Sequence, residues 1–216
     1  MKINIPTKIT IARIACVALL LVFLMVAAIA GTPTNWFGQT VGDSPIYVVD
    51  LITMIVFIVA AATDYLDGHL ARKWNQVTDL GKFLDPIADK MLVNSVFVYL
   101  CVRFDFALGR IWSPLLPFLV ILMILRDLVV DTLRFIAAKK GVVVSANIFG
   151  KAKTVLQMIA IPALLLNGWP FSYFDASWSP YVRIAMILVY ICTAASLLSG
   201  IIYVKDNAGV LKEETK

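Results

Sequence analysis

Charged side chains are scarce in this sequence. Asp, Glu, Lys and Arg make up only 15% of its 216 residues, hydrophobic residues make up 61%, and the mean hydropathy is +0.88. Soluble domains contain about 45–50% apolar residues and about 25% charged ones. The composition therefore excludes an ordinary soluble domain and indicates an integral membrane protein that lies in the lipid bilayer. We expect no nucleic-acid partner.

Histidine and cysteine are also rare. His69 is the one histidine, so neither a Ser–His–Asp triad nor a Cys–His pair is available for nucleophilic catalysis. Cys16, Cys101 and Cys192 lie in different apolar segments, without the spacing of a disulfide framework or a zinc site. We interpret them as small buried residues. We expect no cleavable signal peptide, because the first apolar segment is long and lacks a small-residue cleavage site followed by a soluble domain.

What the sequence has in abundance is long apolar segments. About 20 residues of helix cross the roughly 30 Å hydrocarbon core of a bilayer. The sequence therefore predicts an all-α integral membrane protein of one domain, 1–216, with an amphipathic lead-in at 1–8 and a polar tail at 205–216. The six expected transmembrane helices lie near 9–30, 46–66, 87–104, 112–134, 152–167 and 181–204.

Basic residues are distributed unevenly between the connections. The connections 31–45 and 167–180 contain no Lys or Arg, whereas 139–153 contains four lysines. Assigning alternate connections to one side of the membrane places all but three of the 19 Lys and Arg residues on the same side as both termini. The positive-inside rule then predicts cytoplasmic termini. We expect a multi-pass protein of the cell (inner) membrane.

Four aspartates form the most informative pattern. On a helix Asp64 and Asp67 share one face, and Asp85 and Asp89, four residues apart, share another. Two carboxylate pairs from neighbouring helices can therefore point into one space, where two divalent cations would balance their charge. An unbalanced charge at bilayer depth costs at least about 2.5–3.5 kcal/mol. Carboxylate oxygens select Mg²⁺, Mn²⁺ or Ca²⁺, and a two-metal site of this kind suits displacement at phosphorus. The alternative, helix caps and surface charges, leaves the register of the two pairs unexplained.

The pattern from Asp64 to Asp89, D-x2-D-G-x2-A-R-x8-G-x3-D-x3-D, resembles in full the signature of the CDP-alcohol phosphatidyltransferases. The resemblance implies a homodimeric membrane enzyme with CDP-diacylglycerol as the donor. It also implies two Mg²⁺ or Mn²⁺ ions held by Asp64, Asp67, Asp85 and Asp89, with Asp89 as the catalytic base. The implied donor-binding residues are Asp64, Asp67, Gly68, Ala71, Arg72 and Gly81.

Other residues near the motif allow more than one interpretation. Asp85 either caps the third helix, with Pro86 at its first position, or lies within a helix that began earlier. Gly81 is expected to let the backbone turn between the two helices. Arg72 either binds the diphosphate or anchors the chain at the membrane surface. Thr10 and Arg13, near the amino terminus, either contact substrate or belong to a plain juxtamembrane anchor.

A second polar group lies in the fourth and fifth apolar segments. Charged residues are unusual in a lipid-facing helix, and Asp127 and Asp131 are spaced to share a face and pair with basic neighbours. The segment 146–154 resembles the branch of the family that uses sn-glycerol 3-phosphate as acceptor. By that resemblance Arg126, Arg134, Lys151 and Lys153 form a pocket for the acceptor phosphate, with a helix start at Gly150 adding N–H donors. The alternative is cytoplasmic anchors plus a structural Arg–Asp pair.

The small residues of the last segment, 194–200, are typical of helix packing. The predicted function is transfer of a phosphatidyl group from CDP-diacylglycerol to sn-glycerol 3-phosphate, with release of CMP on the cytoplasmic side. The same chemistry with another acceptor, as in cardiolipin synthases or inositol-phosphate enzymes, is the nearest alternative. An ion-coupled transporter would distribute its acidic residues through the membrane depth, and an inactive lipid-binding scaffold would not need the complete motif.

Overall fold

The computed structural model describes residues 4–30, 39–42, 44, 46–73, 79–102, 113–140, 148–175 and 177–207, and within these the side chains at 5, 6, 28, 30, 65–73, 79, 80, 82 and 83 are not described. The chain divides into two compact units. The first comprises Met1–Arg110 with Leu165–Trp169, and the second comprises Ile111–Leu164 with Pro170–Lys216. Each unit is described separately.

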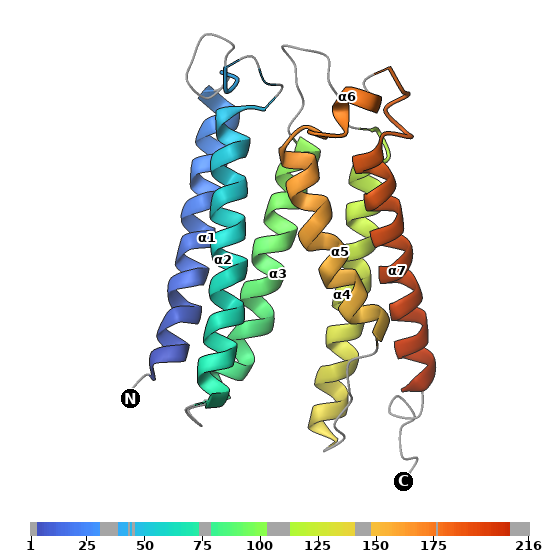
Figure 1. The fold of residues 1–216 in the computed structure, drawn as a ribbon. Helices are drawn as coiled ribbons and strands as arrows, with labels where there is room; N and C mark the ends of the chain where they lie inside the picture. Colours follow the sequence, from blue (N-terminus) through green and yellow to red (C-terminus); the bar gives the residue numbers. More distant parts are fainter. Residues whose placement is uncertain are drawn as a thin grey trace. The chain divides into compact units, whose positions relative to one another are not determined.

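The described residues form helices and no strand, which confirms the all-α prediction (Figure 1). The helices are α1 (Ile5–Ala30), α2 (Val48–Lys73), α3 (Asp79–Val102), α4 (Leu116–Lys139), α5 (Ile148–Leu165), α6 (Ser172–Asp175) and α7 (Ile184–Asp206). Each expected apolar segment overlaps one long helix, whereas the short α6 was not expected. By length and composition, three stretches of the described residues can cross a membrane: Thr7–Ala27, Ile148–Leu165 and Ile184–Asp206. These stretches fit a membrane protein.

The first unit is built around α1, which packs against both α2 and α3; α2 and α3 also touch each other (Figure 1). The buried positions of α1 recur every three or four residues, as expected for one face of a helix. They are polar in the first two turns and apolar afterwards: Thr7, Thr10, Arg13, Val17, Leu20, Leu24 and Ala27. The face of α1 that is buried in the unit therefore carries a guanidinium and two hydroxyls.

The start of α3 distinguishes between the two interpretations of Asp85 and Pro86. The helix begins at Asp79 and continues through Pro86 to Val102, so Asp85 does not cap it. Pro86 lacks an N–H for the carbonyl four residues earlier, but the helix is not ended there. Gly81 is the third residue of α3 and is buried. The expected turn at Gly81 is therefore wrong, because the helix has already started.

In the second unit, α4 packs against α7. Small side chains are frequent on the buried face of α7, where Ser196, Ser199 and Gly200 are buried. Small residues allow two helices to approach closely in a membrane. The first turn of α7 is capped from a distance, since the Ile184 backbone N–H donates to Oδ2 of Asp175 at 2.8 Å. Asp175, at the end of α6, thus satisfies a group that would otherwise lack a partner at a helix start.

Many large apolar side chains are exposed on the outer faces of the helices. Leu19 is 70% exposed on α1, Phe118 is 65% exposed on α4 and Ile201 is 65% exposed on α7. Apolar surface of this extent is rare on soluble proteins, but in a bilayer the same side chains face lipid. Both units therefore have the surface expected of membrane-embedded helices.

Candidate active site

The aspartates of α2 and α3 converge on one basic side chain of α1. Nη1 of Arg13 donates to Oδ1 of Asp64 on α2, and lies 3.3 Å from Oδ1 of Asp89 on α3. The Arg13 side chain is 1% exposed, whereas those of Asp64 and Asp89 are 36% and 51% exposed. The guanidinium is thus buried behind the two carboxylates, which remain open to solvent.

A third aspartate of the motif is held by the same helix. The Thr10 hydroxyl donates to Oδ1 of Asp85 at 2.8 Å. Thr10 and Arg13 are three residues apart and lie on the buried face of α1. Three of the four predicted metal ligands, Asp64, Asp85 and Asp89, are therefore gathered around one turn of α1.

The remaining motif residues of α2 lie outside the described side chains: Asp67, Gly68, Ala71 and Arg72, together with the neighbouring His69. The backbone of α2 is helical through Lys73. Asp64, Asp67, Gly68 and Ala71 therefore occupy positions i, i+3, i+4 and i+7 of one helix, which share a face. The sequence-based prediction of that face stays a prediction for their side chains.

The carboxylates of this site suit a divalent ion. Among the described residues, no three Asp, Glu, His or Cys side chains are already arranged as a metal site. Asp64 and Asp89 nevertheless approach the same cationic nitrogen, Nη1 of Arg13, so their negative charges are concentrated where a cation is stabilised. Carboxylate oxygens are the ligands that Mg²⁺ and Mn²⁺ prefer, and the donor set fits those ions.

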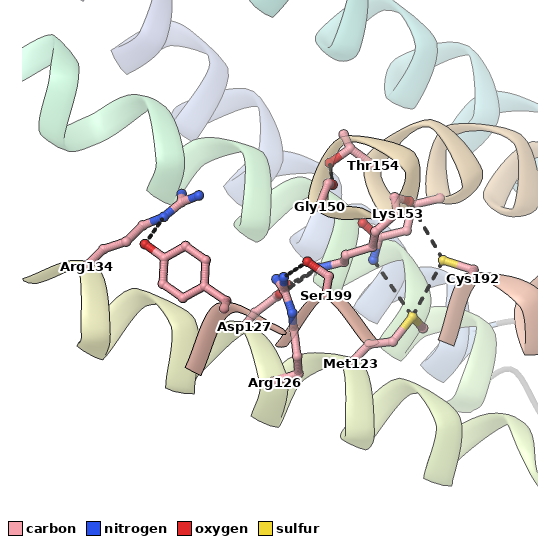
Figure 2. Close-up of polar contacts among 11 residues, drawn as sticks. Met123, Arg126, Asp127, Arg134, Gly150, Lys153, Thr154, Cys192 and Ser199 are labelled. Atoms are coloured by element: carbon pink, nitrogen blue, oxygen red, sulfur yellow. Dashed lines mark hydrogen bonds and ion pairs between the residues drawn. The ribbon is translucent and has the colours of Figure 1, made fainter. Parts of the chain in front are cut away.

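A second charged cluster lies in the other unit, and we call Arg126, Asp127 and Lys153 the Asp127 cluster (Figure 2). Nζ of Lys153, on α5, donates to both carboxylate oxygens of Asp127, at 2.5 Å each. Nη1 of Arg126 donates to Oδ1 of Asp127 at 2.9 Å. The side chains of Asp127 and Lys153 are both 7% exposed and that of Arg126 is 12% exposed. The cluster has one net positive charge and little contact with solvent.

The four residues predicted to bind the acceptor phosphate are only partly brought together. Arg126 and Lys153 meet on Asp127. Arg134 is exposed; its Nε donates to the Tyr203 hydroxyl at 3.2 Å, and its Cζ lies 5.4 Å from the centre of that ring (Figure 2). Lys151 is exposed, two residues before the buried Lys153.

The start of α5 also differs from its prediction. The helix begins at Ile148 rather than at Gly150. Gly150 is the third residue of α5, and its carbonyl accepts a hydrogen bond from the Thr154 hydroxyl at 3.2 Å.

Several polar residues of these two sites were not assigned from the sequence. The sequence allows both an anchor and a substrate contact for Thr10 and Arg13, although an arginine three residues after a threonine in an apolar segment is itself a signal of a buried polar face. The sequence favours helix packing for Ser199 and makes no assignment for Tyr203, whereas in the structure they contact Arg126 and Arg134. No local signal separates a packing serine from one that accepts a hydrogen bond from an arginine on another helix.

The sequence is similar to known proteins over most of its length. A model of the CDP-alcohol phosphatidyltransferase family matches residues 3–198. A CDP-diacylglycerol–glycerol-3-phosphate 3-phosphatidyltransferase of Bacillus subtilis is 39% identical over 97% of both chains. Proteins with the same name from Mycoplasma pneumoniae and Haemophilus influenzae are 35% and 34% identical, over 99% and 98% of this chain and 91% and 97% of their own.

The match runs from residue 3 to residue 198, so it covers both the α1–α3 carboxylates and the Asp127 cluster. An extended match of this kind does not depend on the aspartate motif alone. The chain therefore belongs to the CDP-alcohol phosphatidyltransferase family, whose members are membrane enzymes of phospholipid biosynthesis.

Proposed function

We propose that the protein transfers a phosphatidyl group from CDP-diacylglycerol to sn-glycerol 3-phosphate. The observation that carries the proposal is the convergence of Asp64, Asp85 and Asp89 on one turn of α1. The named activity of the relatives supports the choice of donor and acceptor. The products are phosphatidylglycerophosphate and CMP.

In the proposed reaction a hydroxyl oxygen of the acceptor attacks the phosphorus that carries the diacylglycerol. The bond from this phosphorus to the oxygen shared with CMP breaks, and CMP leaves with the electron pair of that bond. Asp89 accepts the proton of the attacking hydroxyl. Its side chain is 51% exposed, which supports this role because a base must be reachable by the substrate.

Asp64, Asp67, Asp85 and Asp89 would hold two Mg²⁺ or Mn²⁺ ions. When bound, these ions supply positive charge that stabilises the departing phosphate. The protein's own part is to keep the carboxylates together, for which Thr10 and Arg13 provide a hydroxyl donor and a counter-charge. Without such partners the carboxylates would repel one another.

On the donor side, Gly68, Ala71, Arg72 and Gly81 complete the proposed CDP-diacylglycerol site with the aspartates. A small-residue face leaves room for the nucleotide, and a guanidinium can bind a diphosphate through two parallel hydrogen bonds.

For the acceptor phosphate we propose Arg126, Arg134, Lys151 and Lys153. The supporting observation is that Arg126 and Lys153 share a single carboxylate, so the cluster keeps one net positive charge in a poorly solvated place. Hydrogen bonds between a charged donor and a phosphate are strong in such surroundings.

The proposal includes an arrangement in the cell. We propose one domain over 1–216, six transmembrane helices, cytoplasmic termini, a cytoplasmic active site in the cell (inner) membrane, and a homodimer. The basic residues concentrated on the side of the termini support the orientation.

The deciding experiment measures CMP release by the purified protein from CDP-diacylglycerol with Mg²⁺ and one acceptor at a time. We expect CMP with sn-glycerol 3-phosphate and only background release with phosphatidylglycerol or inositol phosphate. Release with one of those acceptors alone would replace the proposed acceptor but keep the chemistry. No CMP with any of them would refute the proposed reaction.

A further inference from the structure

Helix α7 touches the arginines of α4 at three successive places on one face. Ser199 Oγ accepts a hydrogen bond from Nη2 of Arg126 at 2.6 Å. Gly200 lies against the same side chain, and Tyr203 contacts Arg134. Positions 199, 200 and 203 are neighbours on a helix surface. We call these three residues the α7 support.

Within the α7 support, Gly200 is the residue whose replacement would force the Arg126 side chain to move. A Cβ atom at this position would lie 2.8 Å from Cγ, 3.4 Å from Nε and 3.6 Å from Cδ of Arg126. Cγ is the second carbon of the side chain, so it cannot move away unless the whole arginine changes its rotamer. The absence of a side chain at Gly200 is therefore what lets Arg126 follow its observed path along α7.

Both terminal nitrogens of Arg126 are fixed by hydrogen bonds. Nη1 donates to Asp127 at 2.9 Å and Nη2 donates to Ser199 at 2.6 Å. Nε is buried and has no hydrogen-bond partner among the described residues. A guanidinium held at two nitrogens has lost most of its freedom before any ligand arrives.

The second arginine is held in a different way by the same helix. The Tyr203 hydroxyl accepts from Nε of Arg134, and the ring lies beneath the guanidinium carbon at 5.4 Å. A cation over an aromatic face is stabilised by the ring electrons. Arg134 is exposed on α4, so Tyr203 restricts a side chain that solvent would otherwise leave free to move.

We infer that Ser199, Gly200 and Tyr203 are positioning residues for the acceptor phosphate, because they orient Arg126 and Arg134 of α4. The inference rests on the proposed function, in which these arginines bind that phosphate. A side chain fixed in advance loses less conformational freedom on binding, which increases affinity. If the α7 support served helix packing alone, its substitution would lower stability without a selective effect on the acceptor.

The test compares steady-state constants of purified variants with CMP release as the signal. Ser199→Ala removes one hydrogen bond to a charged group without adding volume, and Gly200→Ala displaces Arg126. For each we expect the KM for sn-glycerol 3-phosphate to rise roughly threefold to twentyfold, with less than about a twofold change in the KM for CDP-diacylglycerol. Tyr203→Phe keeps the ring but loses the hydroxyl, so a smaller rise is expected.

Ser196→Ala is the matched control. Ser196 lies three residues before Ser199 on α7, is fully buried, and its hydroxyl has no hydrogen-bond partner among the described residues. Removing this hydroxyl changes the packing surface by the same amount as Ser199→Ala but touches no arginine contact recorded in the structure. We expect both KM values to stay at the parent level.

A double-mutant cycle separates positioning from packing. Arg126→Ala removes Cγ, Cδ and Nε, the atoms that an added Cβ at position 200 would meet. In that background Gly200→Ala and Ser199→Ala should produce no further rise in the acceptor KM, so the effects are strongly non-additive. Because Arg126→Ala removes the overlap, it should also restore the yield of folded protein if Gly200→Ala alone folds poorly.

The outcomes distinguish the inference from the function on which it rests. If Arg126→Ala raises the acceptor KM but neither Ser199→Ala nor Gly200→Ala does, the positioning role is refuted and the acceptor site stands. If Arg126→Ala leaves the acceptor KM unchanged, both are refuted. If Gly200→Ala yields no folded enzyme, Ser199→Ala decides alone, and additive effects in the cycle would also refute the inference.

Discussion

Replacing Asp127 by Asn should destabilise the second unit strongly. Asn has nearly the same shape but no charge, so Lys153 and Arg126 lose their shared negative partner. Both basic side chains are close to buried, at 7% and 12% exposed. Water can therefore do little to replace the carboxylate.

The size of the expected loss of stability follows from this burial. Breaking a buried ion pair by removing one partner costs about 3–5 kcal/mol. The lower end applies to the Asp127 cluster, because Ser199 still accepts from Arg126 and the Asn amide oxygen can accept one hydrogen bond. A loss of about 3 kcal/mol corresponds to a fall in Tm of roughly 6–12 °C for a chain of this size.

Cys192 offers a probe at the same place. Its thiol is fully buried and lies 3.8 Å from both the Met123 sulfur and the Lys153 carbonyl oxygen. In a background with Cys16→Ser and Cys101→Ser, a thiol-reactive dye reports the temperature at which Cys192 becomes accessible. The matched control is Asp131→Asn, one turn further along α4 and only partly buried. For this variant we expect the labelling temperature of Cys192 to fall by less than about 4 °C.

Two results would refute the reasoning. A labelling temperature within about 2 °C of the parent would mean that the buried cations do not depend on Asp127. The second result comes from a double variant, Asp127→Asn with Lys153→Met. This variant has no unpaired lysine, so it should recover much of the stability lost in Asp127→Asn. If the double variant were less stable than Asp127→Asn alone, the cost would not arise from the stranded charge.

Three further outcomes test the proposed chemistry and topology. Excess chelator should abolish CMP release and added Mg²⁺ or Mn²⁺ should restore it, whereas full activity in chelator would exclude a role for the ions. Asp89→Asn should lower kcat by at least roughly a hundredfold with a smaller change in the KM for CDP-diacylglycerol, because the base acts in the chemical step; an equal loss of donor affinity would indicate mainly metal binding. In intact cells, cysteines introduced at Gly38 and at Tyr173, which is 77% exposed, should react with an impermeant thiol reagent, and one at Gln76 should not. Labelling at Gln76 alone would reverse the orientation.

Much of the fold followed from the order of the residues. Apolar segments long enough for a membrane predicted helices, and each of them overlaps one, because in lipid a backbone must satisfy its hydrogen bonds within its own helix. The pairing of Asp127 with basic neighbours was also expected, and the structure confirms it with Arg126 and Lys153. Helix periodicity is a local property, so a single sequence is enough to read it.

Boundaries and turns were predicted less well. The start of α3 at Asp79 placed Gly81 inside a helix rather than in a turn, and α5 began before Gly150. A glycine is compatible with both a turn and a helix, because its cost in a helix is only about 1 kcal/mol. Packing against other helices can outweigh that cost, and packing is not written in the local sequence.

By itself, the sequence determined that this chain is a helical membrane protein with an aspartate motif of the CDP-alcohol phosphatidyltransferases. Only the tertiary structure decided which residues from distant segments contact the motif and the Asp127 cluster. Arg13 is 51 residues from Asp64, and Ser199 is 73 residues from Arg126. A serine or an arginine has the same local propensity whether it faces lipid, packs against a helix or holds a charge. Its role is fixed by what another helix places opposite it, and that depends on how the apolar faces pack.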